Sequence, residues 1–286
     1  MRPWTKPRTN VDFSMQASWT RYLTPGPLHR RLGLVCLGVG TAADKHAALD
    51  ARTLDCYALV YVSRGRGWLE SGGRRATFSA PALFWLLPGV EHSYAPDKAG
   101  WNEWWTLFDG DAARAYEDLG YVPRDRLVTT VSDPDGLELA FAEVARALRT
   151  DAADTDVAAA AAMHQLLVAS RRCGEPETPT DAPVLAALHR HACRPLTIAA
   201  LAKELRVSEP ELREVTRRAA GCTPKEYVMR VRLSRAKELL ATTELPVAAV
   251  ALRTGYDDPG YFSRLFTRRT GMPPGRFRQQ QRHSSP

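Results

Sequence analysis

Long apolar runs are missing from this sequence. No stretch of about 18 apolar residues occurs among its 286 residues, which argues against a membrane-spanning helix and against a membrane partner. Residues 1–16 also lack the apolar core that a secretory signal carries. We therefore expect a cytoplasmic protein.

Cysteine is sparse and irregularly spaced. The sequence has five cysteines, an odd number, and none of them forms a C-x-x-C pair. This pattern argues against both a disulfide framework and a zinc site. His189 and His191 are two residues apart, so on a helix they would not share a face and would make a poor metal pair. We expect no metal and no cofactor.

Positive charge is unevenly distributed along the chain. Residues 184–286 hold 19 lysines and arginines against 9 acidic residues, whereas residues 1–183 hold 20 against 23. A chain of 286 residues has room for two domains, each with its own core. A basic C-terminal third on a slightly acidic body is typical of a DNA-binding domain attached to a domain with another role.

The basic third contains two helical segments joined by a short turn. Apolar residues recur at helical spacing in Val247–Ala251 and again in Phe262–Phe266. Gly255 can end the first helix, and Asp258 with Pro259 can cap and open the second. The exposed face of the second helix would carry Ser263, Arg264, Thr267, Arg268 and Arg269. Two helices, a short turn and a basic second helix predict a helix-turn-helix unit.

Another unit of this kind lies earlier in the chain. Thr197 can cap a short helix, and Ser208 followed by Glu211 forms a capping box for a helix over 209–219. A longer helix, from Pro224 to about residue 241, would join the two units rigidly. Such a connection would let two recognition helices enter successive major-groove segments, about 34 Å apart.

The C-terminal segment also matches a long signature with constrained spacing. The matching residues are Gly255, Tyr256, Pro259, Tyr261, Phe262, Ser263, Arg264, Phe266, Gly271, Pro274, Phe277 and Arg278. They resemble the signature of AraC/XylS-type transcription regulators, and the resemblance covers Leu196–Arg278. It implies binding to double-stranded promoter DNA in the nucleoid, with RNA polymerase as a further candidate partner. It places DNA contacts at Arg213, Glu214, Arg217, Tyr261, Ser263, Arg264, Arg268 and Arg269.

Within this resemblance the two recognition helices differ. In the second, Arg264 is best suited to read guanine, and the alternative is a phosphate contact, for which family members also keep a basic residue there. The residues better placed to hold phosphates are Arg268, Arg269, Arg276 and Arg278. In the first, Glu214 occupies a position that is usually basic in the family, and Thr216 one that is usually aromatic. Glu214 would repel phosphate or accept from a cytosine amino group. We expect the first helix to bind more weakly or to read unusual bases.

Residues 31–109 show a period of two, with Gly and Pro turns between short strands, which predicts a small sandwich or barrel. This block resembles the cupin-like sensor domain of the same family through Pro88, His92, Tyr94, Trp105, Phe108 and Gly110. Two further helices, about 135–148 and 155–171, follow it. The resemblance implies that they dimerise the protein, and the alternative is that they pack only on their own barrel.

Aromatic residues gather in the predicted barrel. Rings with polar tips line many ligand pockets and stack on sugar rings, so we expect a neutral polar effector such as a sugar. The candidate effector-binding residues are Tyr57, Tyr61, Trp85, His92, Trp101 and Trp104. Strand alternation places Trp101 and Trp104 on opposite faces, and the sequence leaves open which face lines the pocket. The alternative, which is favoured for any single ring, is packing in the core.

Metal-dependent catalysis is not expected in this barrel. The H-x-H pair of cupin enzymes is absent from the corresponding segment, Ser63–Glu70, and His92 stands alone. We predict an α+β protein: an arm (1–30), a cupin-like barrel with flanking helices (31–171), a linker (172–183) and an all-α domain of two helix-turn-helix units (184–286). Its predicted function is effector-responsive transcriptional regulation, without enzymatic activity. The alternatives are a barrel that only dimerises or docks a partner, and a cupin-type enzyme with a DNA-binding tail.

Overall fold

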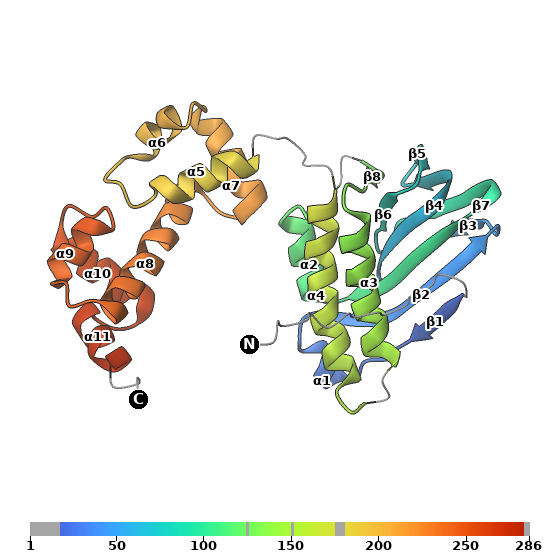
Figure 1. Ribbon diagram of the computed structural model, residues 1–286, viewed down its shortest axis with the longest axis horizontal. Coiled ribbons are helices and arrows are strands. Elements are labelled where there is room, and N and C mark those ends of the chain that lie inside the picture. The colour runs from blue at the N-terminus through green and yellow to red at the C-terminus, as the bar shows by residue number, and fades with distance from the viewer. Residues whose placement is uncertain (1–17, 124–125, 150–151, 175–180, 283–286) are drawn as a thin grey trace, which may run out of the picture. The chain divides into compact units, whose positions relative to one another are not determined.

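A computed structural model describes residues 18–123, 126–149, 152–174 and 181–282. The chain forms two compact units, residues 1–176 and 177–286. The first contains an antiparallel sheet with helices, and the described residues of the second form helices without strands, so the predicted α+β fold class is confirmed (Figure 1). Residues 1–17 of the predicted arm and 175–180 of the predicted linker lie outside the described residues.

The first unit is built on an eight-stranded antiparallel sheet. Its strands are β1 (Trp19–Tyr22), β2 (Val35–Lys45), β3 (Leu49–Arg52), β4 (Tyr57–Ser71), β5 (Arg74–Ser79), β6 (Ala82–Leu86), β7 (His92–Asp109) and β8 (Val128–Thr130). Their order is β1-β2-β7-β4-β6-β8, with β3 on β7 and β5 on β4. The prediction of an irregular segment over residues 1–30 is wrong for β1, which pairs with β2 from Trp19↔Thr41 to Tyr22↔Gly38.

The two central strands are much longer than the sequence pattern indicates. The pattern over residues 31–109 predicts short strands, but β7 runs for 18 residues without a break. Its partner β4 bends at Gly65, where φ is +101° and the pairing register shifts on either side. A Cβ atom at Gly65 would lie 2.5 Å from the carbonyl oxygen of Gly100. The glycine therefore lets the paired strands bend where a larger residue would end them.

Within the described part of the first unit, four helices accompany the sheet. They are α1 (Pro27–Arg30), α2 (Asp111–Asp118), α3 (Pro134–Arg149) and α4 (Thr155–Cys173). Helices α3 and α4 lie side by side against one face of the sheet (Figure 1). They cover a core that includes Tyr57, Tyr61 and Trp104, together with Phe141 of α3 and Met163 of α4. The helix pair thus packs on its own sheet.

The opposite face of the sheet holds a second core. Its buried residues are Ala58, Val60, Val62, Leu69, Phe84, Leu86, Tyr94 and Trp101. Alternation along β4 and β7 sends neighbouring residues to the two cores, so Trp101 and Trp104 lie on opposite faces as predicted. The aromatic residues of one strand therefore serve two separate cores.

The second unit is organised around one long helix. Its elements are α5 (Asp181–His191), α6 (Ile198–Glu204), α7 (Glu209–Ala220), α8 (Pro224–Thr242), α9 (Val247–Arg253), α10 (Pro259–Thr270) and α11 (Pro274–Arg282). Helices α5–α7 pack at one end of α8, and α9–α11 pack at the other (Figure 1). Among the described residues of the whole chain, no helix is long and apolar enough to cross a membrane.

The predicted helix caps are present in this unit. The side chains of Thr197 and Ser208 accept backbone N–H groups at the starts of α6 and α7, and Asp258 does so for α10. Gly271 follows α10 with φ of +81°, the left-handed conformation expected of a glycine C-cap. Local sequence thus sets where α6, α7 and α10 begin and where α10 ends.

Arg232 of α8 ties the two helix-turn-helix units together. Its guanidinium donates to the carbonyl oxygens of Ala192 and Arg194, which precede α6, at 2.7 Å each. It also donates to the carbonyl oxygen of Gly255, in the turn between α9 and α10, at 2.7 Å. One side chain therefore holds the entry to the first unit and the turn of the second on the same long helix.

Candidate DNA interface and effector cleft

Helix α10 presents a basic surface on an apolar anchor. Phe262, Leu265 and Phe266 are buried, which fixes the opposite face of the helix toward solvent. On that face Tyr261 is 48% exposed and the Arg264 side chain 74% exposed, with its guanidinium 4.0 Å from Asp258. Helix α10 contains no acidic residue. The helix therefore adds no negative charge of its own that would repel an anionic partner.

Three of the other predicted contact residues of α10 and α11 already make hydrogen bonds within the protein. The Ser263 hydroxyl donates to the carbonyl oxygen of Pro259 at 2.9 Å, so it points along its own helix. Arg269 donates to Glu226 of α8 at 3.2 Å, whereas Arg268 is exposed. Arg278 donates to the carbonyl oxygen of Leu245, a structural contact that differs from the expected phosphate role.

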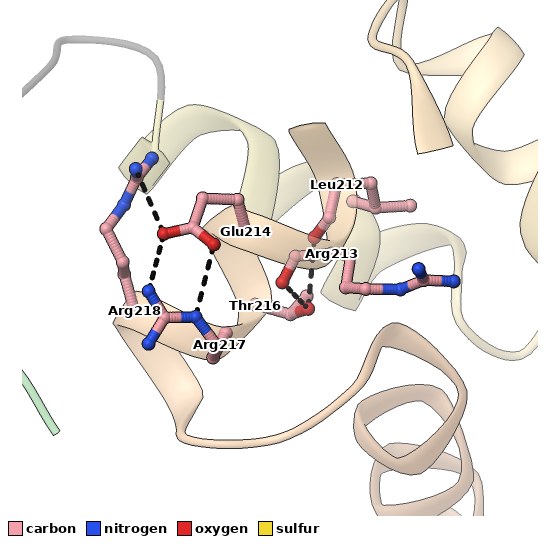
Figure 2. Close-up of polar contacts among 6 residues, drawn as sticks. All are labelled: Leu212, Arg213, Glu214, Thr216, Arg217 and Arg218. Atoms are coloured by element: carbon pink, nitrogen blue, oxygen red, sulfur yellow. Dashed lines mark hydrogen bonds and ion pairs between the residues drawn. The ribbon is translucent and has the colours of Figure 1, made fainter. Parts of the chain in front are cut away.

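Helix α7 carries a charge cluster of a different kind, shown in Figure 2. Glu214 accepts from Nε of Arg217 at 3.1 Å and from its Nη2 at 2.6 Å, and it lies 3.6 Å from Arg218. The hydrogen bond from Arg217 lowers the pKa of Glu214. The Arg213 side chain points away from this cluster (Figure 2). Three acidic residues balance three arginines along α7, in contrast to α10.

Thr216 is accommodated by hydrogen bonds of its own helix. Its side chain is completely buried, and its hydroxyl is 3.0 Å from the carbonyl oxygen of Leu212 and 3.1 Å from that of Arg213 (Figure 2). A buried hydroxyl without such a partner would be destabilising. The small polar residue at this usually aromatic position is therefore compatible with the packed core.

Two of the six predicted effector-binding residues reach a common cleft. Tyr57 and Trp85 line a cleft of about 560 Å³ at one end of the sheet. Charged side chains from strands, turns and α2 complete the lining, namely Asp55, Arg74, Asp109, Arg114, Glu117 and Arg126. The Tyr57 hydroxyl donates to Glu117 at 2.8 Å, and burial together with this bond raises the pKa of Tyr57 to about 12. The lining of the cleft thus contains two aromatic side chains, three arginines and three carboxylates.

The other four predicted residues lie in the packed interior. Tyr61 stacks on Phe141 of α3 with ring centroids 6.2 Å apart, and Trp104 packs against the same ring at 5.8 Å in a tilted arrangement. The Tyr61 hydroxyl donates to Glu138. His92 and Trp101 face the second core on the opposite side of the sheet. The six residues therefore do not form one pocket.

A buried ion pair in the second core was not predicted from the sequence. Lys45 lies 2.6 Å from Glu103, whose other oxygen accepts from the Trp101 indole at 2.9 Å. The ammonium also sits 4.8 Å from the centre of the Tyr94 ring. A single glutamate among the tryptophans of 101–105 was the available signal. Across the described part of the chain, no group of three metal-ligating side chains occurs.

Both units are similar to domains of known proteins. Residues 39–167 match the model of the AraC-like ligand binding domain, and residues 201–280 match a helix-turn-helix domain. The MmsAB operon regulatory protein of Pseudomonas aeruginosa is 28% identical, covering 98% of this chain and 93% of its own length.

Two further relatives cover most of the chain. The HTH-type transcriptional activator RhaR of Klebsiella pneumoniae is 26% identical over 78% of this chain and 85% of its own. The arabinose operon regulatory protein of Salmonella typhimurium is 27% identical over 78% of this chain and 83% of its own. The chain therefore belongs to the AraC/XylS family of DNA-binding transcriptional regulators, with a ligand-binding domain ahead of its helix-turn-helix domain.

Proposed function

We propose that this regulator binds promoter DNA mainly through α10, and that a sugar or related polar metabolite bound in the N-terminal unit controls this binding. The observation that carries the DNA part is the exposed face of α10, where Arg264 and Arg268 project from a helix without acidic residues. Arg264 is the proposed base reader, Arg268 holds phosphate, and Tyr261 contacts the groove. The proposal includes no catalytic step, metal or cofactor.

The DNA part is tested with binding sites selected from random duplexes by the full-length protein. Replacing Arg264 with alanine should lower affinity for the selected site by about tenfold and relax preference at one base pair, since a bidentate guanine contact discriminates by about 1–3 kcal/mol. Replacing Arg268 should weaken binding to every sequence alike. An unchanged base preference in the Arg264 variant would reject its assigned role.

The effector part rests on the cleft beside Tyr57 and Trp85. Its volume of about 560 Å³ suits a small ligand. Aromatic faces can stack on a sugar ring, while three arginines and three carboxylates can hydrogen-bond to its hydroxyls without a net charge in the cleft. The name of the arabinose operon regulatory protein, a relative of this chain, also supports a sugar.

A thermal-shift screen of sugars and other metabolites tests this cleft. A bound effector should raise the melting temperature, and Tyr57→Phe should reduce the rise because the hydroxyl that donates to Glu117 is removed. Tyr116→Phe is the matched control, since its hydroxyl contacts His164 outside the cleft. A response only to another chemical class would reject the sugar. No response from any compound would favour a unit that only dimerises or docks a partner.

We also propose a homodimer that contacts RNA polymerase at the promoter. Leu139 of α3 and Val157 of α4 are 65% and 46% exposed, although the rest of these helices packs on the sheet, and they support a contact between two copies. Light scattering should show a dimer that Leu139→Glu weakens. A monomeric mass that persists on DNA would reject the dimer.

Binding of the effector should change the affinity for DNA, and binding of DNA should change the affinity for the effector by the same factor.

A further inference from the structure

Glu214 holds the exposed Arg217 through two hydrogen bonds. The two carboxylate oxygens accept from Nε and Nη2, at 3.1 and 2.6 Å, while 64% of the Arg217 side chain stays accessible (Figure 2). This is the forked, two-bond geometry that fixes a guanidinium in orientation as well as in position. The side chain therefore stands at the surface in a defined conformation.

The fork leaves one edge of the guanidinium unused by Glu214. Of its five N–H donors, one on Nε and one on Nη2 point to Glu214, so the donors on Nη1 and the second one on Nη2 remain for another partner. A pair of donors on one guanidinium edge matches the O6 and N7 acceptors of guanine in the major groove. Arg217 is thus oriented as a base reader of one particular kind.

The same carboxylate makes phosphate a poor alternative partner. Phosphates are the most accessible negative charges on DNA and attract an unrestrained arginine regardless of sequence. Glu214 carries a negative charge beside Arg217 and lies 3.6 Å from Arg218, so it offsets their attraction to the backbone. Along α7, three acidic residues balance three arginines. This helix therefore gains little from the sequence-independent part of DNA binding.

We propose that Glu214 positions Arg217 to read a guanine in the major groove, and that the pair exchanges phosphate affinity for base selectivity. Arg217 is the contacting residue and Glu214 the positioning residue. The inference rests on the proposed function, since it requires that α7 lies in the major groove.

The test is selection of binding sites from random duplexes by four forms of the full-length protein: wild type, Glu214→Ala, Glu214→Gln and Arg217→Ala. Both alanine variants should lose the preference for guanine at the same position, by about tenfold. Glu214→Gln should keep part of it, because the amide oxygen still accepts one N–H. Glu143→Ala is the matched control, since Glu143 also accepts from Nε and Nη2 of an arginine three residues on, Arg146 of α3, at 3.0 and 2.7 Å, although both bonds go to one carboxylate oxygen.

A second measurement separates positioning from damage to the fold. Glu214→Ala should bind random DNA more tightly than wild type, and the slope of log affinity against log salt should steepen by about one, since a freed arginine neutralises one more phosphate. A variant that merely unfolds α7 would lose affinity for every sequence. Tighter random binding with a lost guanine preference is the expected combination.

Three results would overturn the inference. In the first, Arg217→Ala lowers affinity uniformly and leaves the selected motif unchanged, which makes Arg217 a phosphate contact. In the second, Glu214→Ala removes a cytosine preference that Arg217→Ala retains, which makes Glu214 itself the reader. In the third, wild type enriches no motif, which rejects the proposed function as well.

Discussion

Replacing Arg232 with methionine removes the guanidinium that joins the two helix-turn-helix units but keeps an unbranched side chain on α8. Three carbonyl oxygens lose a donor at 2.7 Å, and two of these bonds are partly buried. A hydrogen bond from a charged group contributes about 1.5 kcal/mol or more, so the two partly buried bonds predict a loss of about 3 kcal/mol. With a urea m-value of about 1.5 kcal/mol/M, the unfolding midpoint should fall by about 2 M.

The distribution of tryptophan provides an internal reference for this measurement. All seven tryptophans lie between Trp4 and Trp105, in the first unit, so tryptophan fluorescence follows that unit alone. Far-ultraviolet circular dichroism follows the helices of both units. Arg232→Met should lower the midpoint of the dichroism change that belongs to the second unit and leave the fluorescence transition in place.

Arg235→Met is the control on the same helix. Arg235 is 57% exposed and pairs with Glu238, a surface ion pair that contributes less than about 1 kcal/mol. Equal shifts for the two variants would refute the argument, since they would show that the three carbonyl contacts of Arg232 add nothing beyond an ordinary surface charge.

Three further predictions concern packing, charge and pH. Thr216→Phe, which installs the aromatic residue usual in the family, should destabilise the second unit by about 1–3 kcal/mol, because Thr216 is fully buried in a packed core. Lys45→Met should destabilise the first unit by about 3–5 kcal/mol, since Glu103 would stay buried without its ammonium partner. Burial lowers the pKa of His92, so as the pH falls the histidine is protonated in the unfolded chain before it is protonated in the folded one. The free energy of unfolding of the first unit should therefore decline as the pH falls below about 6.5.

Each of these is measured by urea unfolding with the signal of the affected unit. Thr216→Val, which keeps the volume and removes the hydroxyl, is the control for the aromatic substitution. Glu103→Gln in the Lys45→Met background should recover part of the lost stability. His92→Gln should flatten the pH dependence, and an unchanged acid slope in that variant would assign it to other groups.

Elements with locally encoded boundaries were predictable from the sequence. The caps at Ser208 and Asp258 act within three residues of their own position, so the starts of α7 and α10 are written into the local sequence. The length of β7 was not predictable, because its continuation depends on a bend at Gly65 in the partner strand. Sheet pairing depends on residues that are distant in the sequence, and the pattern of one strand gives no information about its partner strand.

The candidate sites were also predictable only where local sequence determines which side chains are exposed. Helical spacing placed Arg264 and Arg268 on the exposed face of α10 correctly, since Phe262 and Phe266 bury the other side. The aromatic residues of the sheet could not be assigned to a pocket, because α3 covers Tyr61 and Trp104. The charged lining of the effector cleft comes from separate turns, strands and α2, which only the tertiary fold brings together.

The ion pairs on the DNA-binding unit have a consequence for how binding responds to salt. Arg217 reaches DNA already paired with Glu214, and Arg269 is paired with Glu226. Such carboxylates act as built-in counterions on the protein. When an arginine moves from a carboxylate to a phosphate, the carboxylate on the protein loses its partner. That carboxylate then attracts a cation from solution while the DNA releases one. The salt dependence of DNA binding should therefore be shallower than the number of arginines on the surface suggests.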